Sequence, residues 1–219
     1  MRPERAALDR RLGRLRQGFP AADALLILNE KNIRYLTGFT GGDGALLVGP
    51  DWLELLVDGR YVTQARGEAP GREIVEFRTR VEGIAGVARR RGLGRIAFEA
   101  AGLSVEEHSR LQAGLPEAEF LPLLGALSPL RAVKDRREIA RIREAARIAG
   151  AALAAVREMI RPGVREREIA LELEYRMRRD GAERAAFDTI VASGPNSACP
   201  HAAPGDRKIR RGDCVKVDY

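Results

Sequence analysis

The segment 186–219 holds the side chains of this sequence whose chemistry is most distinctive. His201, one of two histidines in the chain, lies in a loop between Pro200 and Pro204, and Asp218 follows it by 17 residues. An imidazole changes its protonation near neutral pH, and a carboxylate is a hard ligand for divalent cations. Taken alone, a loop histidine is most often solvated, and an aspartate at a strand end most often begins a turn. The residue types by themselves therefore do not distinguish a functional site from an ordinary surface.

Turn-forming residues are expected to hold this histidine beside a short strand. The segment 193–197 is dense in turn residues, and Gly212 returns the chain into a predicted strand over 214–218. Because side chains alternate along a strand, Lys216 and Asp218 share one face, while the valines next to them point to the other. Asp218 is therefore expected on the more polar face, as a site residue should be.

Two helices are predicted upstream of this segment. Asp135 and Glu138 have the spacing of a capping box, and apolar residues follow at three- and four-residue steps as far as Ile160. Pro162 ends this long helix, and a second helix is predicted over 166–180. The second domain therefore begins with two helices that are expected to lie on a curved sheet.

In the first part of the chain, short apolar runs alternate with helical patterns. After an N-terminal helix, the predicted elements are strands over 24–28, 44–48, 53–58, 73–77 and 95–98 and helices over 82–91 and 104–114. This alternation indicates an α/β domain with a mixed sheet and flanking helices. The stretch 125–133 lacks clear periodicity, so the two domains are expected to cover 1–130 and 131–219.

Composition and charge exclude several classes of protein. The net charge is +7, but the basic residues are scattered among acids, so no nucleic-acid partner is expected. The apolar runs are too short to cross a bilayer and the N-terminus lacks a secretion signal, which predicts no membrane partner and a cytoplasmic location. Cys199 and Cys214 are outside any CxxC spacing and are expected to be free thiols. The basic run 207–211 is expected to be a solvated turn.

Two groups of motifs resemble those of a known enzyme family. The stretch NIRYLTGF at 32–39, together with VDGRY at 57–61, resembles the creatinase-type N-terminal domain. The stretch FDTIVASGPNSA at 187–198, followed by His201 and by GDCVKVDY at 212–219, resembles the opening of the pita-bread catalytic domain of Xaa-Pro aminopeptidases and prolidases. The implied fold is an α/β creatinase-like domain followed by an incomplete α+β pita-bread domain.

The resemblance implies a metal-dependent peptidase that hydrolyses the bond between an N-terminal residue and proline through a water bridging two metal ions. Asp218 would correspond to the first ligand of two divalent ions, manganese or cobalt. His201 would correspond to the residue that binds the substrate and stabilises the tetrahedral intermediate. The implied partners are a peptide or dipeptide with proline in second position and a second copy of the complete enzyme.

Most of the metal ligands implied by the resemblance have no matching positions here. The family uses two Asp, one His and two Glu, and only the first Asp falls within these 219 residues. The chain by itself is therefore expected to bind no metal stably and to be inactive. Loss of the strands that cover its helices is expected to leave the apolar residues Ile139, Ile142 and Val156 exposed, which would promote association.

Other functions on the same fold are left open. A non-catalytic pita-bread relative would use the fold as a peptide-binding or interaction module; the missing Asp, His and two Glu beyond Tyr219 would distinguish an enzyme from such a module. Creatine or methionine-peptide chemistry is a further alternative. The creatinase-type N-terminal domain argues against a plain methionine aminopeptidase, and the sequence does not separate an aminopeptidase from a dipeptidase.

Overall fold

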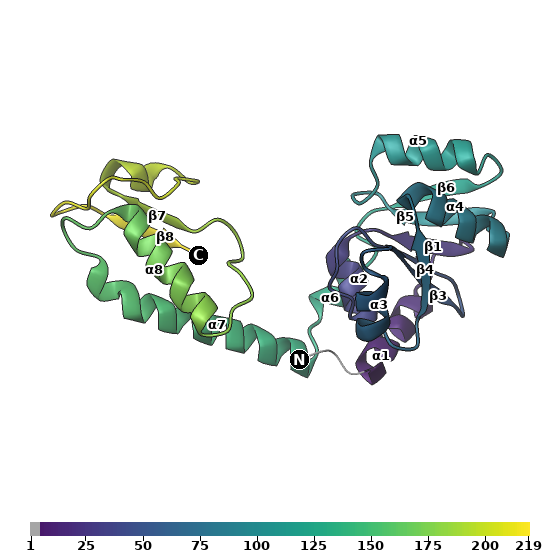
Figure 1. Cartoon of the computed structure of the whole chain (residues 1–219), viewed down its shortest axis with the longest axis horizontal. Helices are drawn as coiled ribbons and strands as arrows, with labels where there is room; N and C mark the ends of the chain where they lie inside the picture. Colours follow the sequence, from purple (N-terminus) through teal and green to yellow (C-terminus); the bar gives the residue numbers. More distant parts are fainter. Residues whose placement is uncertain (1–4) are drawn as a thin grey trace. The chain divides into compact units, whose positions relative to one another are not determined.

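The computed structural model describes residues 5–219, and the chain divides into two compact units between Val133 and Lys134 (Figure 1). Unit 1 contains a six-stranded sheet and unit 2 contains a two-stranded sheet. In the range 5–219, no helix has the length and apolar character needed to cross a bilayer.

The sheet of unit 1 is mixed, in the order β4-β3-β2-β1-β5-β6. Its strands are β1 (Ala24–Ile27), β2 (Ala45–Val48), β3 (Leu53–Asp58), β4 (Glu73–Phe77), β5 (Arg95–Glu99) and β6 (Glu119–Leu123). The neighbours β1, β2 and β3 pair antiparallel, whereas β3–β4, β1–β5 and β5–β6 are parallel. The strand β6, which contains Pro122, was not predicted from the sequence; it is an edge strand, where a proline is tolerated.

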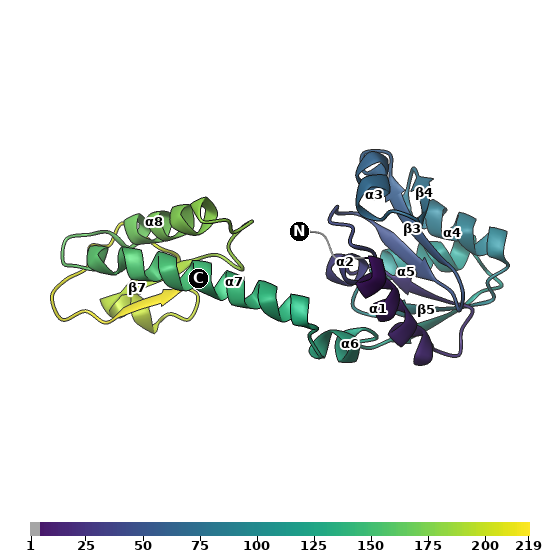
Figure 2. The ribbon, with the colours of Figure 1, turned by 90° about the horizontal axis from the view of Figure 1, so that it is seen from below.

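Helices cover both faces of this sheet (Figure 2). They are α1 (Arg5–Gln17), α2 (Glu30–Thr37), α3 (Val62–Glu68), α4 (Arg80–Arg91), α5 (Val105–Gly114) and α6 (Ser128–Ala132). Side-chain alternation divides the strands between two cores: Leu25 and Ile27 pack with α1 and α2, and Leu26 packs with α4 and α5. The expected fold class, a mixed sheet with flanking helices, is confirmed.

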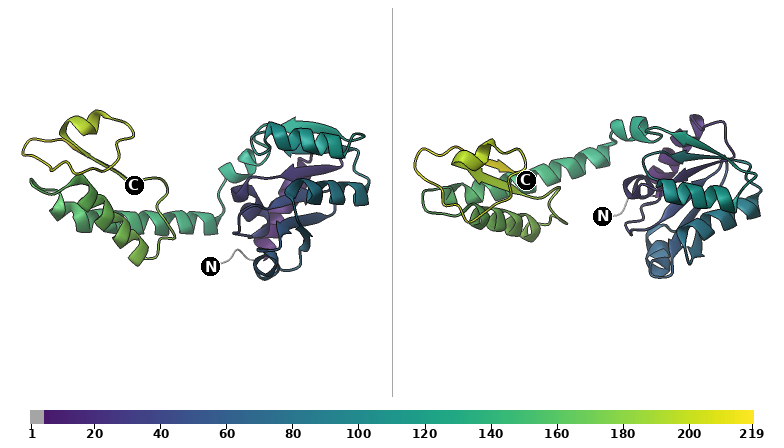
Figure 3. Two further views of the ribbon diagram at one scale, coloured as in Figure 1. Left: turned by 45° about the horizontal axis from the view of Figure 1, so that its top comes forward. Right: turned by 90° about the horizontal axis from the view of Figure 1, so that it is seen from above.

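Unit 2 places two helices on one side of a small antiparallel sheet (Figure 3). Its elements are α7 (Arg136–Val156), the 3-10 turn η1 (Arg157–Met159), α8 (Glu166–Arg179), β7 (Ile190–Ser193), the 3-10 turn η2 (Gly194–Ala198) and β8 (Val215–Asp218). Ile148 of α7, Leu173 of α8 and Val191 of β7 share one buried core. This core holds the sheet that carries the C-terminal motif.

The expected exposure of α7 is partly wrong. Ile139 and Ile142 are 38% and 55% exposed, as expected, but Val156 is completely buried. The reason is local, because Val156 belongs to the core that α7 shares with α8 and needs no further strands to cover it. Within α7, the exposed large apolar side chains therefore lie in its first half.

Candidate functional site

The strand β8 presents Asp218 on the face away from the helices. Val215 and Val217 pack against the core of unit 2, so Lys216 and Asp218 lie on the opposite face by alternation. Asp218 pairs in register with Ile190 of β7 and its side chain is exposed. An exposed carboxylate at the end of a paired strand is fixed at its backbone and open to a ligand.

His201 lies in a loop that Lys216 ties to this face. We call residues 194–205 the histidine loop. The Lys216 ammonium donates a hydrogen bond to the carbonyl of Pro200 at 3.2 Å and another to the carbonyl of Cys199. Because Lys216 and Asp218 share one face of β8, these bonds hold the backbone before His201 over the face that carries Asp218. In the part of the chain that the structure describes, no hydrogen bond or ion pair joins His201 and Asp218 directly.

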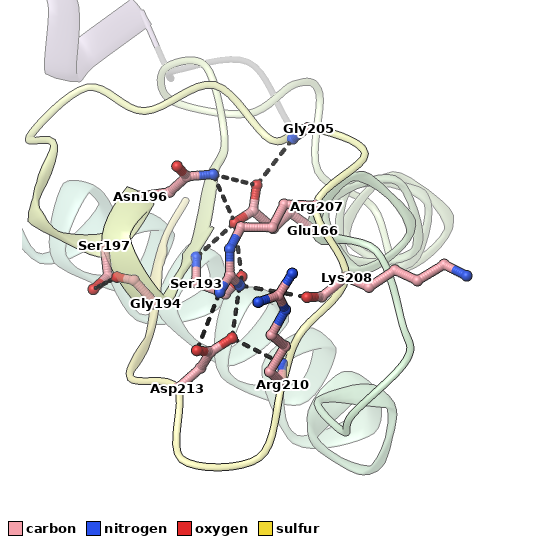
Figure 4. A network of polar contacts seen from close by, with 10 residues as sticks. All are labelled: Glu166, Ser193, Gly194, Asn196, Ser197, Gly205, Arg207, Lys208, Arg210 and Asp213. Atoms are coloured by element: carbon pink, nitrogen blue, oxygen red, sulfur yellow. Dashed lines mark hydrogen bonds and ion pairs between the residues drawn. The ribbon is translucent and has the colours of Figure 1, made fainter.

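A buried carboxylate fixes both ends of the histidine loop (Figure 4). Glu166, the first residue of α8, is completely buried. Its Oε1 accepts hydrogen bonds from the backbone N–H of Ser193 at 2.7 Å and from the Ser193 hydroxyl at 2.8 Å. The Asn196 amide donates to both carboxylate oxygens at 3.2 Å, and the Gly205 N–H donates to Oε2 at 3.2 Å. One side chain therefore joins the segments before and after His201.

The surroundings of Glu166 favour its ionised form. Burial raises the pKa of a carboxyl group because it disfavours the charge. Hydrogen bonds from Ser193, Gly205 and Asn196 outweigh that effect, and the pKa of Glu166 is lowered below its ordinary value. Its position in the first turn of α8 also favours a negative charge, because the N-terminal end of a helix carries a partial positive charge.

Backbone pairing fastens the end of the loop to the start of α8. The N–H groups of Glu166 and Arg167 donate to the carbonyls of Arg207 and Gly205, each at 3.1 Å. The Ile209 N–H donates to the Val164 carbonyl at 2.9 Å. Ile209 is 5% exposed and belongs to the core. The expectation of a solvated turn over 207–211 is therefore wrong for its apolar member, because pairing draws the segment inwards.

Arg207 is also drawn into the network. Its guanidinium contacts both oxygens of Asp213, at 2.6 and 3.1 Å, and donates to the Ser193 hydroxyl. The bond from Arg207, together with the N–H of Arg210, lowers the pKa of Asp213. Gly194 lies against this pair with φ of 51°, and a Cβ there would come within 2.6 Å of Asp213 Oδ1. The turn after β7 therefore requires glycine.

The residues present do not by themselves fit a metal pair. Within the described range, 5–219, no group of three or more His, Cys, Asp or Glu side chains could hold a metal ion. Asp218 supplies one carboxylate, and His201 is held by its loop over the same face. A divalent cation needs more oxygen or nitrogen ligands than these.

The residues that hold the loop have no distinctive pattern in the sequence. Glu166 resembles an ordinary acidic residue in the first turn of a helix, and Arg207 resembles a member of a solvated basic run. Alternation along 214–218 predicts the face of Lys216 but not its bonds to the histidine loop. No local pattern distinguishes a buried carboxylate from an exposed one, so the only available signal was the turn-rich motif that packs against Glu166.

The motifs of unit 1 lie where strands end. Asn29 caps α2 by accepting from the N–H groups of the first turn, and Glu99 at the end of β5 accepts from the Leu28 and Asn29 N–H groups at 2.9 Å. At the end of β3, Arg60 contacts Asp58 at 2.6 Å. An open cleft of about 890 Å³ borders this pair and is lined by residues 58–60 and 76–78.

His108, the other histidine of the chain, packs against the rings of Phe98 and Phe120, with ring centroids 5.5 and 5.7 Å apart from its own. Its role is therefore structural.

Comparison with known families accounts for both units. Residues 11–133 match the creatinase/prolidase N-terminal domain, and residues 140–219 match metallopeptidase family M24. The first match covers more than half of the chain. The chain therefore belongs to the creatinase/prolidase family, with a region of metallopeptidase family M24 after the N-terminal domain. The family resemblance inferred from the motifs is confirmed.

Individual relatives support the same conclusion. An uncharacterized peptidase of Bacillus subtilis is 35% identical over 198 residues, which are 90% of this chain and 56% of that protein. The solved Xaa-Pro dipeptidase from Bacillus anthracis has a TM-score of 0.89 and 37% identity, and the match covers 96% of this chain and 60% of that one. The X-Pro aminopeptidase from Thermotoga maritima has a TM-score of 0.82 and 33% identity, over 93% and 59% of the two chains. The chain thus spans a little over half the length of these relatives.

Proposed function

We propose that this chain supplies part of the site of a metal-dependent peptidase that removes an N-terminal residue preceding proline or cleaves Xaa-Pro dipeptides. The observation that carries this proposal is the pair of bonds from Lys216, which holds the histidine loop over the face of β8 that presents Asp218. The relatives named Xaa-Pro dipeptidase and X-Pro aminopeptidase support the substrate class. They do not separate the two reactions.

In this proposal the two side chains have different roles. Asp218 is one ligand of a pair of divalent ions, manganese or cobalt, which would activate a water molecule when bound. His201 binds the peptide and donates a hydrogen bond to the carbonyl oxygen as negative charge develops there. Both side chains are exposed on the same unit, so a peptide can reach them. The further ligands come from residues outside these 219.

The organisation of the protein is part of the same proposal. The creatinase-type N-terminal domain is proposed to cover 1–130, and the beginning of the catalytic domain is proposed to cover 131–219. The complete enzyme is proposed to be a cytoplasmic homodimer that acts on peptides and contacts neither nucleic acid nor membrane. The family resemblance supports these assignments.

Manganese binding tests the role of Asp218. Mn²⁺ is paramagnetic and broadens NMR signals near it, so a titration of the ¹⁵N-labelled chain should broaden the signals around Asp218 with weak affinity. Asp218→Asn should abolish this broadening. Asp206→Asn, which alters an aspartate whose side chain is 68% exposed, should leave it unchanged. Equal broadening in the wild type and in Asp218→Asn would remove Asp218 from the proposed ligands.

The inactivity of the chain by itself is a separate proposal. One carboxylate cannot hold two cations, so the purified 219-residue chain should release no N-terminal residue from an Xaa-Pro peptide in the presence of Mn²⁺. Release is measured by chromatography of the products. Manganese-dependent release that disappears in Asp218→Asn would show that this chain completes a metal site without the missing ligands.

A peptide-binding module is the second candidate function. The histidine loop is held by contacts within unit 2, such as the bond from Gly205 to Glu166, and this order without a metal favours the module. A metal-free chain that binds an Xaa-Pro peptide, with shifts at His201 and no broadening of Asp218 by Mn²⁺, would support the module over the peptidase.

A further inference from the structure

Glu166 accepts more hydrogen bonds than its position on a helix requires. Three segments donate to one carboxylate: the end of β7 through Ser193, η2 through Asn196, and the end of the histidine loop through Gly205. The two ends of α8 are capped by other contacts, so the helix does not depend on these hydrogen bonds. His201 lies between the second and third of these segments, so the carboxylate closes the loop that contains it (Figure 4).

We propose that Glu166 is a positioning residue for His201: its carboxylate joins the two ends of the histidine loop and thereby holds the imidazole over the face of β8 that carries Asp218. This inference rests on the role of His201 in the proposed function. Glu166 does not contact a substrate itself, because it is completely buried beneath the loop. It acts through the backbone on either side of His201.

The chemistry of the donors explains why a carboxylate is needed. An ionised carboxylate has about four acceptor sites and no donor, so it can accept from Ser193, Asn196 and Gly205 together. A glutamine of the same shape has one acceptor oxygen and an NH₂ group, which would face N–H donors. Hydrogen bonds to a charged acceptor are also stronger than neutral ones. The substitution Glu166→Gln therefore removes the clamp with little change in volume.

Two NMR measurements on the full chain test the proposal. The chain has only two histidines, so His201 is observed directly and His108 serves as an internal control. In Glu166→Gln, the Gly205 amide should exchange with solvent about tenfold faster or more, and the His201 imidazole signals should shift towards those of a free histidine. The signals of His108 and of the buried methyl groups of unit 2 should stay in place.

A matched variant on the same turn of α8 provides the control. Glu168 accepts from the Arg165 N–H at 2.9 Å and, among residues 5–219, makes no hydrogen bond to the histidine loop. Glu168→Gln should leave Gly205 exchange and the His201 signals unchanged. Loss of order at His201 in Glu168→Gln to the same extent would overturn the proposal, because it would show a general effect of weakening α8. Unchanged His201 signals in Glu166→Gln would overturn it as well.

A milder variant covers the case in which Glu166→Gln unfolds unit 2. Asn196→Ala removes one donor and leaves the carboxylate paired with Ser193 and Gly205. It should move the His201 signals in the same direction by a smaller amount, and unchanged signals would contradict the clamp. These measurements need no peptide, so their failure is distinct from failure of the proposed function, which would appear as no response of wild-type His201 to an Xaa-Pro dipeptide.

Discussion

The two units each contain a completely buried glutamate, and the two side chains are stabilised in different ways. In unit 1, Glu54 of β3 accepts hydrogen bonds from Arg90 and Arg91 of α4. This pair of cations therefore joins a strand to a helix, and both are regular elements. In unit 2, Glu166 accepts from neutral donors in irregular segments. A buried carboxylate can thus either join regular elements or give shape to a loop, and only the second use places a candidate site residue.

Replacing each of these glutamates with leucine should produce the largest difference in stability loss between the two units. Glu166→Leu leaves the buried donors of Ser193 and the part-buried donors of Asn196 and Gly205 without an acceptor, which should destabilise unit 2 by about 3 kcal/mol or more. Glu54→Leu should cost less, because Arg90 and Arg91 are 51% and 28% exposed and can turn to water. Denaturant unfolding followed by NMR signals of each unit measures both values. A larger loss for Glu54→Leu would reverse the comparison.

Two glycine-to-alanine substitutions in unit 2 should change its stability in opposite directions. Gly194→Ala places a Cβ against Asp213 and Arg207 at a positive φ, so we expect a loss of about 1–3 kcal/mol. Gly150→Ala, in α7 with no atom near the new Cβ, should instead stabilise the helix by up to about 1 kcal/mol. Thermal unfolding of the two variants provides the measurement. If Gly194→Ala were as stable as the wild type, the turn after β7 would not need glycine.

Acid should loosen the histidine loop before the core of unit 2. The pKa of Glu166 is lowered on folding, so its contribution to stability is complete above its ordinary pKa of about 4.5 and is lost as the pH falls through the lowered folded-state value. Arg207 and Asp213 lie beside it, and the pKa of Asp213 is lowered too, which adds a loss of the same sign.

Amide exchange of Gly205 below pH 4.5 measures this effect, after correction for the intrinsic pH dependence of exchange. Glu166→Gln should reduce the acid dependence to the part that Asp213 contributes. Protection of Gly205 that stays constant through this range in the wild type would show that the ionised form of Glu166 is not required.

Local signals in the sequence predicted most of the regular elements. The capping boxes at Ser104 with Glu107 and at Asp135 with Glu138 are both formed, because each involves residues only three positions apart. Alternation along 214–218 predicted which face of β8 carries Asp218. The strand β6 was missed because Pro122 is a strand breaker in most contexts, and its edge position follows only from the completed sheet.

The contacts that shape the candidate site lie beyond what local patterns reveal. The donors to Glu166 are 27 to 39 residues away along the chain. Lys216 is 16 and 17 residues from the carbonyls it contacts. Such contacts depend on packing of the whole unit, so His201 and Asp218 could be proposed from their motif, whereas the side chains that hold them could not.

The length of the connection between β7 and β8 has a consequence for folding. The helices α7 and α8 are close in sequence and can pair early, whereas joining β7 to β8 must close the long segment that contains His201. Closing a longer segment costs more chain entropy, and contacts distant in sequence form more slowly. We therefore expect the surface shared by His201 and Asp218 to form last during folding. Pulse-labelling of the Gly194 amide, which donates to the Cys214 carbonyl across the two segments, would reveal that order.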